Sequence, residues 1–183
     1  ERLGSLARII IECIGQSDAL YHNYEHTWLV TMAGRDILQG LRMSRGIQPA
    51  DYTHLIVACL LHDIGYVRGI LSGDSSDEFV VNEDGLKITL PRGASDAALM
   101  PYHVDRSKLF AMERLGNSSM MDVARIVEAI EYTRFPPSPE RRPSSAAPNS
   151  RSMRREGRWR ASTPHSNAQS PRTHERSRPL KKK

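Results

Sequence analysis

The stretch Ala58-Cys59-Leu60-Leu61-His62-Asp63-Ile64-Gly65 places a histidine and an aspartate side by side at the end of an apolar run, just before a glycine. Apolar positions from Leu55 to Leu61 recur at helical spacing, so the stretch predicts a helix that ends near His62 and Asp63. Burying these two side chains is costly unless they are paired or coordinate a metal. The pair is therefore a candidate functional site.

A second candidate lies upstream, in the segment Tyr21-His22-Asn23-Tyr24-Glu25-His26. Apolar spacing predicts a helix from about residue 22 to residue 38, ended by Gly40. His22 and His26 are four residues apart, so on a helix they share one face with Cβ atoms about 6 Å apart. The pair either acts jointly on a ligand or forms only local hydrogen bonds.

The remaining pattern is also mainly helical. We predict a first helix over about residues 2–14, a third helix N-capped by Asp51, and helical turns after Asp96 that are interrupted by Pro101 and continue to Gly116. Residues 119–122 resemble a capping box that opens a last helix. Alternating residues over 79–90 predict a small β-hairpin inserted between helices, which we interpret as a lid. The expected fold class is all-α with this hairpin inserted.

Charge divides the chain at residue 136. Residues 1–136 contain 13 Lys and Arg against 18 Asp and Glu, whereas residues 137–183 contain 13 against 3 and seven of the eleven prolines. We predict a domain over 1–136 and a disordered, basic Arg/Ser/Pro-rich tail over 137–183. The tail is interpreted as a basic arm for nucleic acid or an acidic membrane, as a solvated extension, or as out-of-frame sequence in place of the natural C-terminus.

Two features of the sequence predict a cytoplasmic protein: its two cysteines are expected to be free thiols, and it shows no signal-peptide pattern. Cys13 and Cys59 both fall inside apolar helical patterns, where a free thiol behaves as a small hydrophobe. The sequence shows no signal-peptide pattern and no run of about 18 apolar residues that would predict a membrane span.

The order of these motifs resembles that of the HD-domain metal-dependent phosphohydrolases. His26, followed by the adjacent His62 and Asp63, corresponds to the beginning of the signature His…His-Asp…Asp, and residues 21–30 are similar to the first signature of the cyclic-nucleotide phosphodiesterases in that superfamily. Residues 61–69, 101–107 and 133–136 are similar to a bacterial, notably cyanobacterial, subgroup of such enzymes. The resemblance implies an HD-type helical bundle.

This resemblance implies a role for each matching residue. His26, His62 and Asp63 would bind a divalent metal ion, whose activated hydroxide attacks a phosphoester such as a nucleotide or cyclic nucleotide. His22 would be the general acid that protonates the leaving oxygen. The ligand types admit Mn, Mg, Fe or Zn.

Three further residues have two interpretations each. Asn23 either orients a ligand or substrate, or is an ordinary helix-start amide. His103 either supplies a substitute metal ligand or is a loop histidine, and Arg106 either clamps a phosphate or lies on a helix surface.

The sequence departs from the family pattern at two places. The phosphodiesterases have a further His three residues after the His-Asp pair, where this chain has Tyr66, and the last Asp ligand has no counterpart after Asp122. Glu128 or Glu131 are the available substitutes. These departures favour, as an alternative, a catalytically impaired ligand-binding or regulatory module. A further alternative is binding of nucleic acid or a protein partner through the basic tail.

Overall fold

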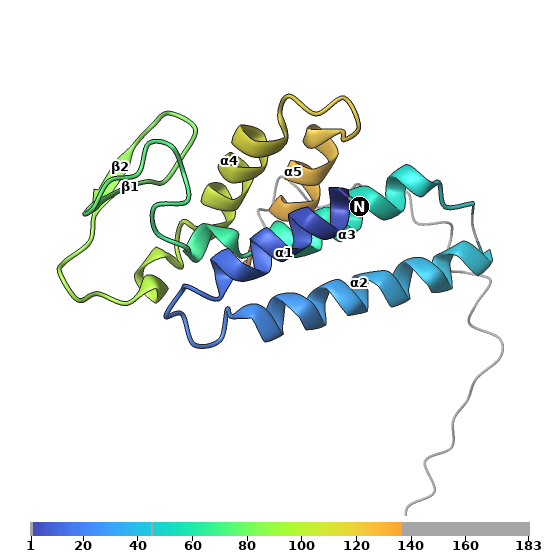
Figure 1. Cartoon of the computed structure of the whole chain (residues 1–183), viewed down its shortest axis with the longest axis horizontal. Helices are drawn as coiled ribbons and strands as arrows, with labels where there is room; N and C mark the ends of the chain where they lie inside the picture. Colours follow the sequence, from blue (N-terminus) through green and yellow to red (C-terminus); the bar gives the residue numbers. More distant parts are fainter. Residues whose placement is uncertain (1, 45, 137–183) are drawn as a thin grey trace, which may run out of the picture. The chain divides into compact units, whose positions relative to one another are not determined.

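The computed structural model describes residues 2–44 and 46–136, all within one compact unit of the chain. These residues form a mainly helical structure with a two-stranded antiparallel hairpin (Figure 1). In chain order the elements are α1 (Arg2–Ile14), α2 (Tyr24–Ser44), α3 (Pro49–Leu61), the 3-10 helix η1 (Ile64–Tyr66), β1 (Glu78–Val80), β2 (Lys87–Thr89), the 3-10 helix η2 (Asp96–Leu99), α4 (His103–Leu115) and α5 (Val123–Glu131).

Helix α3 lies at the centre of the packing. It contacts α1, α2 and α5, and α5 in turn packs on α4. Val57 and Leu61 of α3 are fully buried, as is Ile64 directly after it, because this apolar run has helices on several sides. None of the described helices combines the length and the apolar character needed to span a lipid bilayer.

The predicted bounds are correct for α1 and wrong at both ends of α2. Helix α2 begins at Tyr24, so His22 precedes the helix, and it continues past Gly40 to Ser44. Gly40 is exposed and does not adopt a left-handed conformation. A glycine inside a helix costs only about 1 kcal/mol, and continued helical contacts offset such a cost.

The starts of α3 and α5 also differ from the predictions. Helix α3 begins at Pro49 with Gln48 as N-cap, and the Asp51 carboxylate accepts a hydrogen bond from the Gln48 backbone N–H at 3.0 Å. Asp51 is therefore the third helical residue rather than the cap. Helix α5 is capped by Asp122, whose side chain accepts from the Arg125 backbone N–H, so the cap is the last residue of the segment 119–122 and Ser119 does not cap the helix.

The hairpin occurs where it was predicted, with shorter strands. Phe79 pairs with Ile88 in an antiparallel register, and the Phe79 side chain is buried. The turn between the strands lies at residues 81–86, with Gly85 in a left-handed conformation. The hairpin lies beside α4 in Figure 1, between η1 and η2 along the chain.

Candidate functional site

Four imidazoles gather around the buried carboxylate of Asp63. Its Oδ2 atom lies 2.9 Å from Nδ1 of His22, 3.3 Å from Nε2 of His26 and 3.0 Å from Nε2 of His62. Its Oδ1 atom lies 3.8 Å from Nε2 of His103. We call these five residues the Asp63 cluster.

The ends of helices position the cluster. His26 lies in the first turn of α2, His62 caps the C-terminus of α3, and His103 is the first residue of α4. Adjacent residues inside a helix diverge by about 100°. Because α3 ends at Leu61, His62 and Asp63 escape this constraint, and their side chains meet at one point.

Asn23 supports the cluster through the backbone. Its Oδ1 accepts a hydrogen bond from the His26 N–H at 3.0 Å, and its Nδ2 donates to the Leu20 carbonyl. This is the contact of an N-cap residue with the third helical position, so Asn23 fixes the start of the helix that carries His26. The structure gives it the helix-start role.

Backbone carbonyls fix the tautomers of two imidazoles. Nδ1 of His62 lies 2.8 Å from the Cys59 carbonyl oxygen, and Nδ1 of His103 lies 2.6 Å from that of Met100. A carbonyl only accepts, so each Nδ1 carries a proton and donates. In the neutral imidazole, Nε2 then keeps a lone pair that faces Asp63. Histidines that bind metals are typically held by such a second hydrogen bond.

The Asp63 charge and burial set the acidities in the cluster. Burial raises the pKa of Asp63, but contacts with His62 and His22 outweigh burial and lower this pKa to about 2. Burial lowers the pKa of His26 and of His103, and the Asp63 charge only partly offsets this effect. For His62, the Asp63 carboxylate outweighs burial and raises the pKa. Asp63 is therefore an anionic centre among polar rings.

The donor set fits a divalent cation. The Nε2 atoms of His26 and His62 lie 3.3 Å apart, and each lies 3.0–3.3 Å from Asp63 Oδ2. Neighbouring donors around one cation with bonds of about 2.1 Å are separated by about 3.0–3.4 Å, so these three atoms have suitable mutual distances. A second set of three potential ligand atoms, one each from His22, His26 and Asp63, also lies close together, with all three atoms within 4.8 Å of one another.

Two tyrosines contact the cluster, and the sequence interpretation gave neither a role. The Tyr66 ring stacks on His22 and on His103, at centroid distances of 4.3 and 4.6 Å. The Tyr21 ring lies 5.0 Å from His22 and 4.8 Å from His26, with its side chain largely exposed. The available signal for Tyr66 was its position three residues after Asp63, because residues i and i+3 of a 3-10 turn lie on the same side.

The structure contradicts both interpretations of Arg106. Its side chain is fully buried, and its guanidinium donates to the carbonyls of Gly65, Val67 and Val80 and to both carboxylate oxygens of Asp74, at 2.6–3.0 Å. These contacts use its five N–H donors, so none is left for a phosphate. Arg106 instead fixes the loop that follows Asp63.

A glycine allows this loop to approach α4 closely. A Cβ atom built on Gly65 would collide with the His103 carbonyl oxygen and with Arg106 Cβ. The Gly65 N–H also donates to Ser107 Oγ at 2.9 Å, and Ser107 Oγ donates to the His62 carbonyl. Glycine at this position therefore brings the His103 end of α4 against the cluster.

The two glutamates considered as substitute ligands are engaged elsewhere. Glu131 contacts Arg134 at 2.6 Å and Lys108 at 2.8 Å, and Glu128 accepts a hydrogen bond from the Tyr132 hydroxyl. Neither belongs to the described group around Asp63. Neither glutamate therefore takes the place of the last Asp ligand in the described structure, where His103 is the additional donor near Asp63.

The Glu131 ion pairs should give folding a measurable pH dependence. Arg134, then Lys108, outweigh burial and lower the pKa of Glu131 to about 2, against an ordinary value of 4.5. A depressed carboxyl pKa stabilises the folded chain above the unfolded-state pKa, and this contribution is lost as the pH falls from about 4.5 to about 2. The urea midpoint should therefore fall less in Glu131→Gln than in the wild type between about pH 6 and about pH 3. Arg134→Met should reduce this pH dependence too. If the urea midpoint fell equally in the wild type and in both variants, the Glu131 ion pairs would not be the cause of the pH dependence.

Comparison with known protein families gives a match over most of the chain. The sequence profile of the Npun_R2479-like family matches residues 2–155, which is most of the chain, and the protein therefore belongs to this family. The match continues past Pro136 into the Arg/Ser/Pro-rich segment, whose residues lie outside the described structure. No curated protein sequence and no solved structure matches the chain.

Proposed function

We propose that this member of the Npun_R2479-like family is a metal-dependent phosphohydrolase with an HD-type site. His26, His62 and Asp63 would hold a divalent cation. His22 would donate a proton to the leaving oxygen of a small phosphoester, such as a nucleotide or a cyclic nucleotide. The observation that carries the proposal is the convergence of three imidazole nitrogens within 3.3 Å of one Asp63 oxygen. When bound, the cation supplies Lewis-acid chemistry, which activates water and neutralises phosphate charge.

His22 is suited to proton transfer by its contacts. Its Nδ1 faces the Asp63 carboxylate, which accepts the hydrogen bond and fixes the orientation of the ring, as in other aspartate–histidine pairs. The Nε2 atom is then the ring nitrogen that gives the proton to a substrate oxygen. The His22 side chain is 29% exposed, so a substrate can approach it.

Substitution of His22 separates proton transfer from metal binding. His22→Ala should lower kcat by about 10²–10⁴-fold, because the general acid is lost while the donors of His26, His62 and Asp63 remain. Metal affinity, measured by titration calorimetry, should fall by no more than about 10- to 100-fold, because His22 contributes only a hydrogen bond to the Asp63 carboxylate. A larger loss of metal affinity would instead make His22 a ligand.

His103 should contribute to metal affinity in place of the missing carboxylate. Its protonated Nδ1 and the Tyr66 stack hold Nε2 toward Asp63. His103→Ala should therefore weaken metal binding by about 10-fold or more. The matched control is His54→Gln: His54 Nε2 accepts a hydrogen bond from the Asp122 N–H, so this change should alter stability and spare metal affinity. Equal metal affinity in the wild type and His103→Ala would show that His103 is no ligand.

The proposal is tested by metal analysis followed by hydrolysis assays. Protein loaded separately with Mn²⁺, Fe²⁺, Mg²⁺ or Zn²⁺ is assayed on aryl phosphate mono- and diesters and on cyclic nucleotides. We expect hydrolysis that stops with a chelator and returns with the metal. Activity that survives in both His62→Ala and Asp63→Ala would refute the site assignment.

A regulatory HD-type module is the second candidate. Two observations favour it: Tyr66 occupies the position where the resemblance calls for a further histidine, and the described part of α5 sends no carboxylate to the cluster. A protein of this kind binds the metal and a phosphorylated ligand without turnover. Metal binding with no hydrolysis of any assayed ester would support this candidate over the enzyme.

Binding of nucleic acid through the basic tail is a separate hypothesis. Residues 137–183 lie outside the described residues, so only their charge supports it. On this hypothesis the full chain should bind nucleic acid in a salt-sensitive way. Removal of residues 137–183 should abolish this binding and leave metal binding unchanged.

A further inference from the structure

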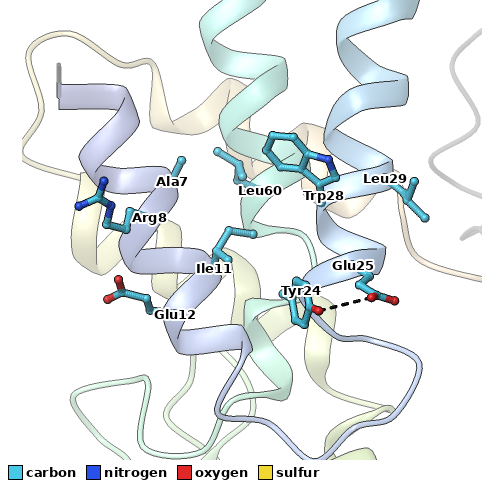
Figure 2. A pocket seen from close by; sticks show the side chains of 9 residues that line it. All are labelled: Ala7, Arg8, Ile11, Glu12, Tyr24, Glu25, Trp28, Leu29 and Leu60. Carbon is cyan, nitrogen blue, oxygen red and sulfur yellow. Dashed lines mark hydrogen bonds between the residues drawn. The ribbon is translucent and has the colours of Figure 1, made fainter.

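His22 lies in an irregular segment that does not by itself fix its ring. The segment is the bend between α1 and α2, whereas His26 is already in the first turn of α2. The rings of His62 and His103 are each anchored by a hydrogen bond to a backbone carbonyl. Tyr24, the first residue of α2, points into the apolar groove between α1 and α2 (Figure 2). The orientation of the His22 ring therefore depends on side chains from other elements.

A hydrogen bond and a stacked ring together define this orientation. His22 Nδ1 lies 2.9 Å from Asp63 Oδ2, and this contact alone would let the ring tilt and move its Nε2. The Tyr66 ring lies against the imidazole at a centroid distance of 4.3 Å, with 19° between the two planes. The rings of Tyr21 and His26 meet the imidazole at 79° and 78°, so they touch it with an edge. Stacking on Tyr66 therefore fixes the plane that the hydrogen bond leaves free.

Tyr66 is itself rigidly held. Its side chain is buried, and its backbone N–H donates to the Asp63 carbonyl at 3.1 Å. The carbonyls on either side of it, those of Gly65 and Val67, accept hydrogen bonds from the buried Arg106 guanidinium at 2.8 and 3.0 Å. A residue fixed on both sides in this way is a firm support for a neighbouring ring.

We propose that Tyr66 is a positioning residue, whose ring holds His22 so that Nε2 faces the leaving oxygen of the substrate. This inference rests on the proposed function, in which His22 donates the proton. The same ring stacks on His103 at 4.6 Å, and the His22 and His103 centroids lie 6.0 Å apart. One side chain thus sets the placement of the proton donor relative to the additional metal ligand. Both contacts are made by the ring, so phenylalanine can take the place of Tyr66.

The leaving group of the substrate tests this role at saturating metal. A phenolate needs a proton as it departs, whereas 4-nitrophenolate leaves without one, so only the phenyl phosphoester depends strongly on a well-placed general acid. Tyr66→Leu should lower kcat on the phenyl ester by about 10- to 100-fold and change KM by less than about threefold. On the 4-nitrophenyl ester, kcat should fall by less than about threefold. Tyr66→Phe should behave as wild type on both esters.

Two further variants separate positioning from a general loss of packing. Phe110→Leu removes another buried ring, about two helical turns along α4 from His103, and should affect the two esters equally. In a His22→Ala background, Tyr66→Leu should change kcat by less than about twofold, because residues that act as a unit are not additive. A loss that is equal for both esters, or that persists without His22, would overturn the proposal. Equal kcat of wild type and Tyr66→Leu on the phenyl ester would overturn it too.

NMR relaxation of the His22 ring in the full chain without added metal gives a readout that needs no activity. The order parameter of the ring should stay in the rigid range in wild type, Tyr66→Phe and Phe110→Leu, and fall below about 0.6 in Tyr66→Leu. An equally rigid His22 ring in wild type and Tyr66→Leu would overturn the positioning role. If the wild type hydrolyses no ester while the His22 ring loosens only in Tyr66→Leu, the proposed function fails and the positioning of His22 by Tyr66 stands.

Discussion

Replacing Asp63 with Asn is expected to abolish metal binding and hydrolysis together. The Asp63 carboxylate contacts His22, His26 and His62 through one oxygen, so within the described residues it is the anionic group that these three imidazoles share. An amide removes the charge that attracts the cation and presents an N–H group or a neutral oxygen in its place. Metal affinity should fall by at least about 100-fold, and kcat/KM by about 10³-fold or more.

Titration calorimetry and steady-state kinetics check this expectation, with circular dichroism to confirm that the variant is folded. The matched control is Asp84→Asn, because Asp84 is exposed in the hairpin turn, where its carboxylate accepts a hydrogen bond from the nearby Asn82 side chain. Asp84→Asn should behave as wild type in all three measurements. An Asp63→Asn protein that keeps near-wild-type metal affinity would remove the basis for the proposed function.

Four of the five residues of the Asp63 cluster, all except His103, could be grouped from the sequence because they stand out within two short segments. His62 and Asp63 interrupt an apolar helix at its end, where polar side chains need a specific reason to be buried. His22 and His26 repeat at a helical interval, and the two segments come together because α2 packs on α3. The grouping needed only two helices and their contact, which hydrophobic spacing indicates well.

Other parts of the site depend on contacts that spacing does not reveal. The stack of Tyr66 on His22 and His103 needs η1 to lie against the start of α4. That approach depends on Gly65, whose lack of a side chain has no signature in hydrophobic periodicity. The sequence therefore suggested His103 as a possible donor without indicating what would hold it in place.

Arg106 shows why a charged residue on a predicted helix is hard to interpret. Its nearest ion-pair partner, Asp74, is 32 residues earlier in an irregular segment, and three of its acceptors are backbone carbonyls. Composition and spacing report none of these acceptors. Charged residues are rarely buried unless paired, so a surface or ligand-binding role was the ordinary expectation.

We expect Arg106→Ala to destabilise the fold rather than to impair substrate binding directly. The change leaves the buried Asp74 carboxylate without its cationic partner and removes the guanidinium donor from three carbonyls, which typically costs about 3–5 kcal/mol in the free energy of unfolding. Urea denaturation measures this loss. Arg114→Ala, on the exposed side of the same helix, is the matched control and should cost less than about 1 kcal/mol.

Arg106→Lys separates the structural role from the phosphate clamp. An ammonium keeps the positive charge but cannot match the planar fork that reaches Gly65, Val67, Val80 and Asp74, so the lysine variant should recover only part of the stability. Among molecules that remain folded, KM should stay near the wild-type value because no guanidinium donor faces the substrate. A lysine variant with wild-type stability and a much higher KM would return Arg106 to the substrate site, and would mean that the loop after Asp63 is held by other contacts.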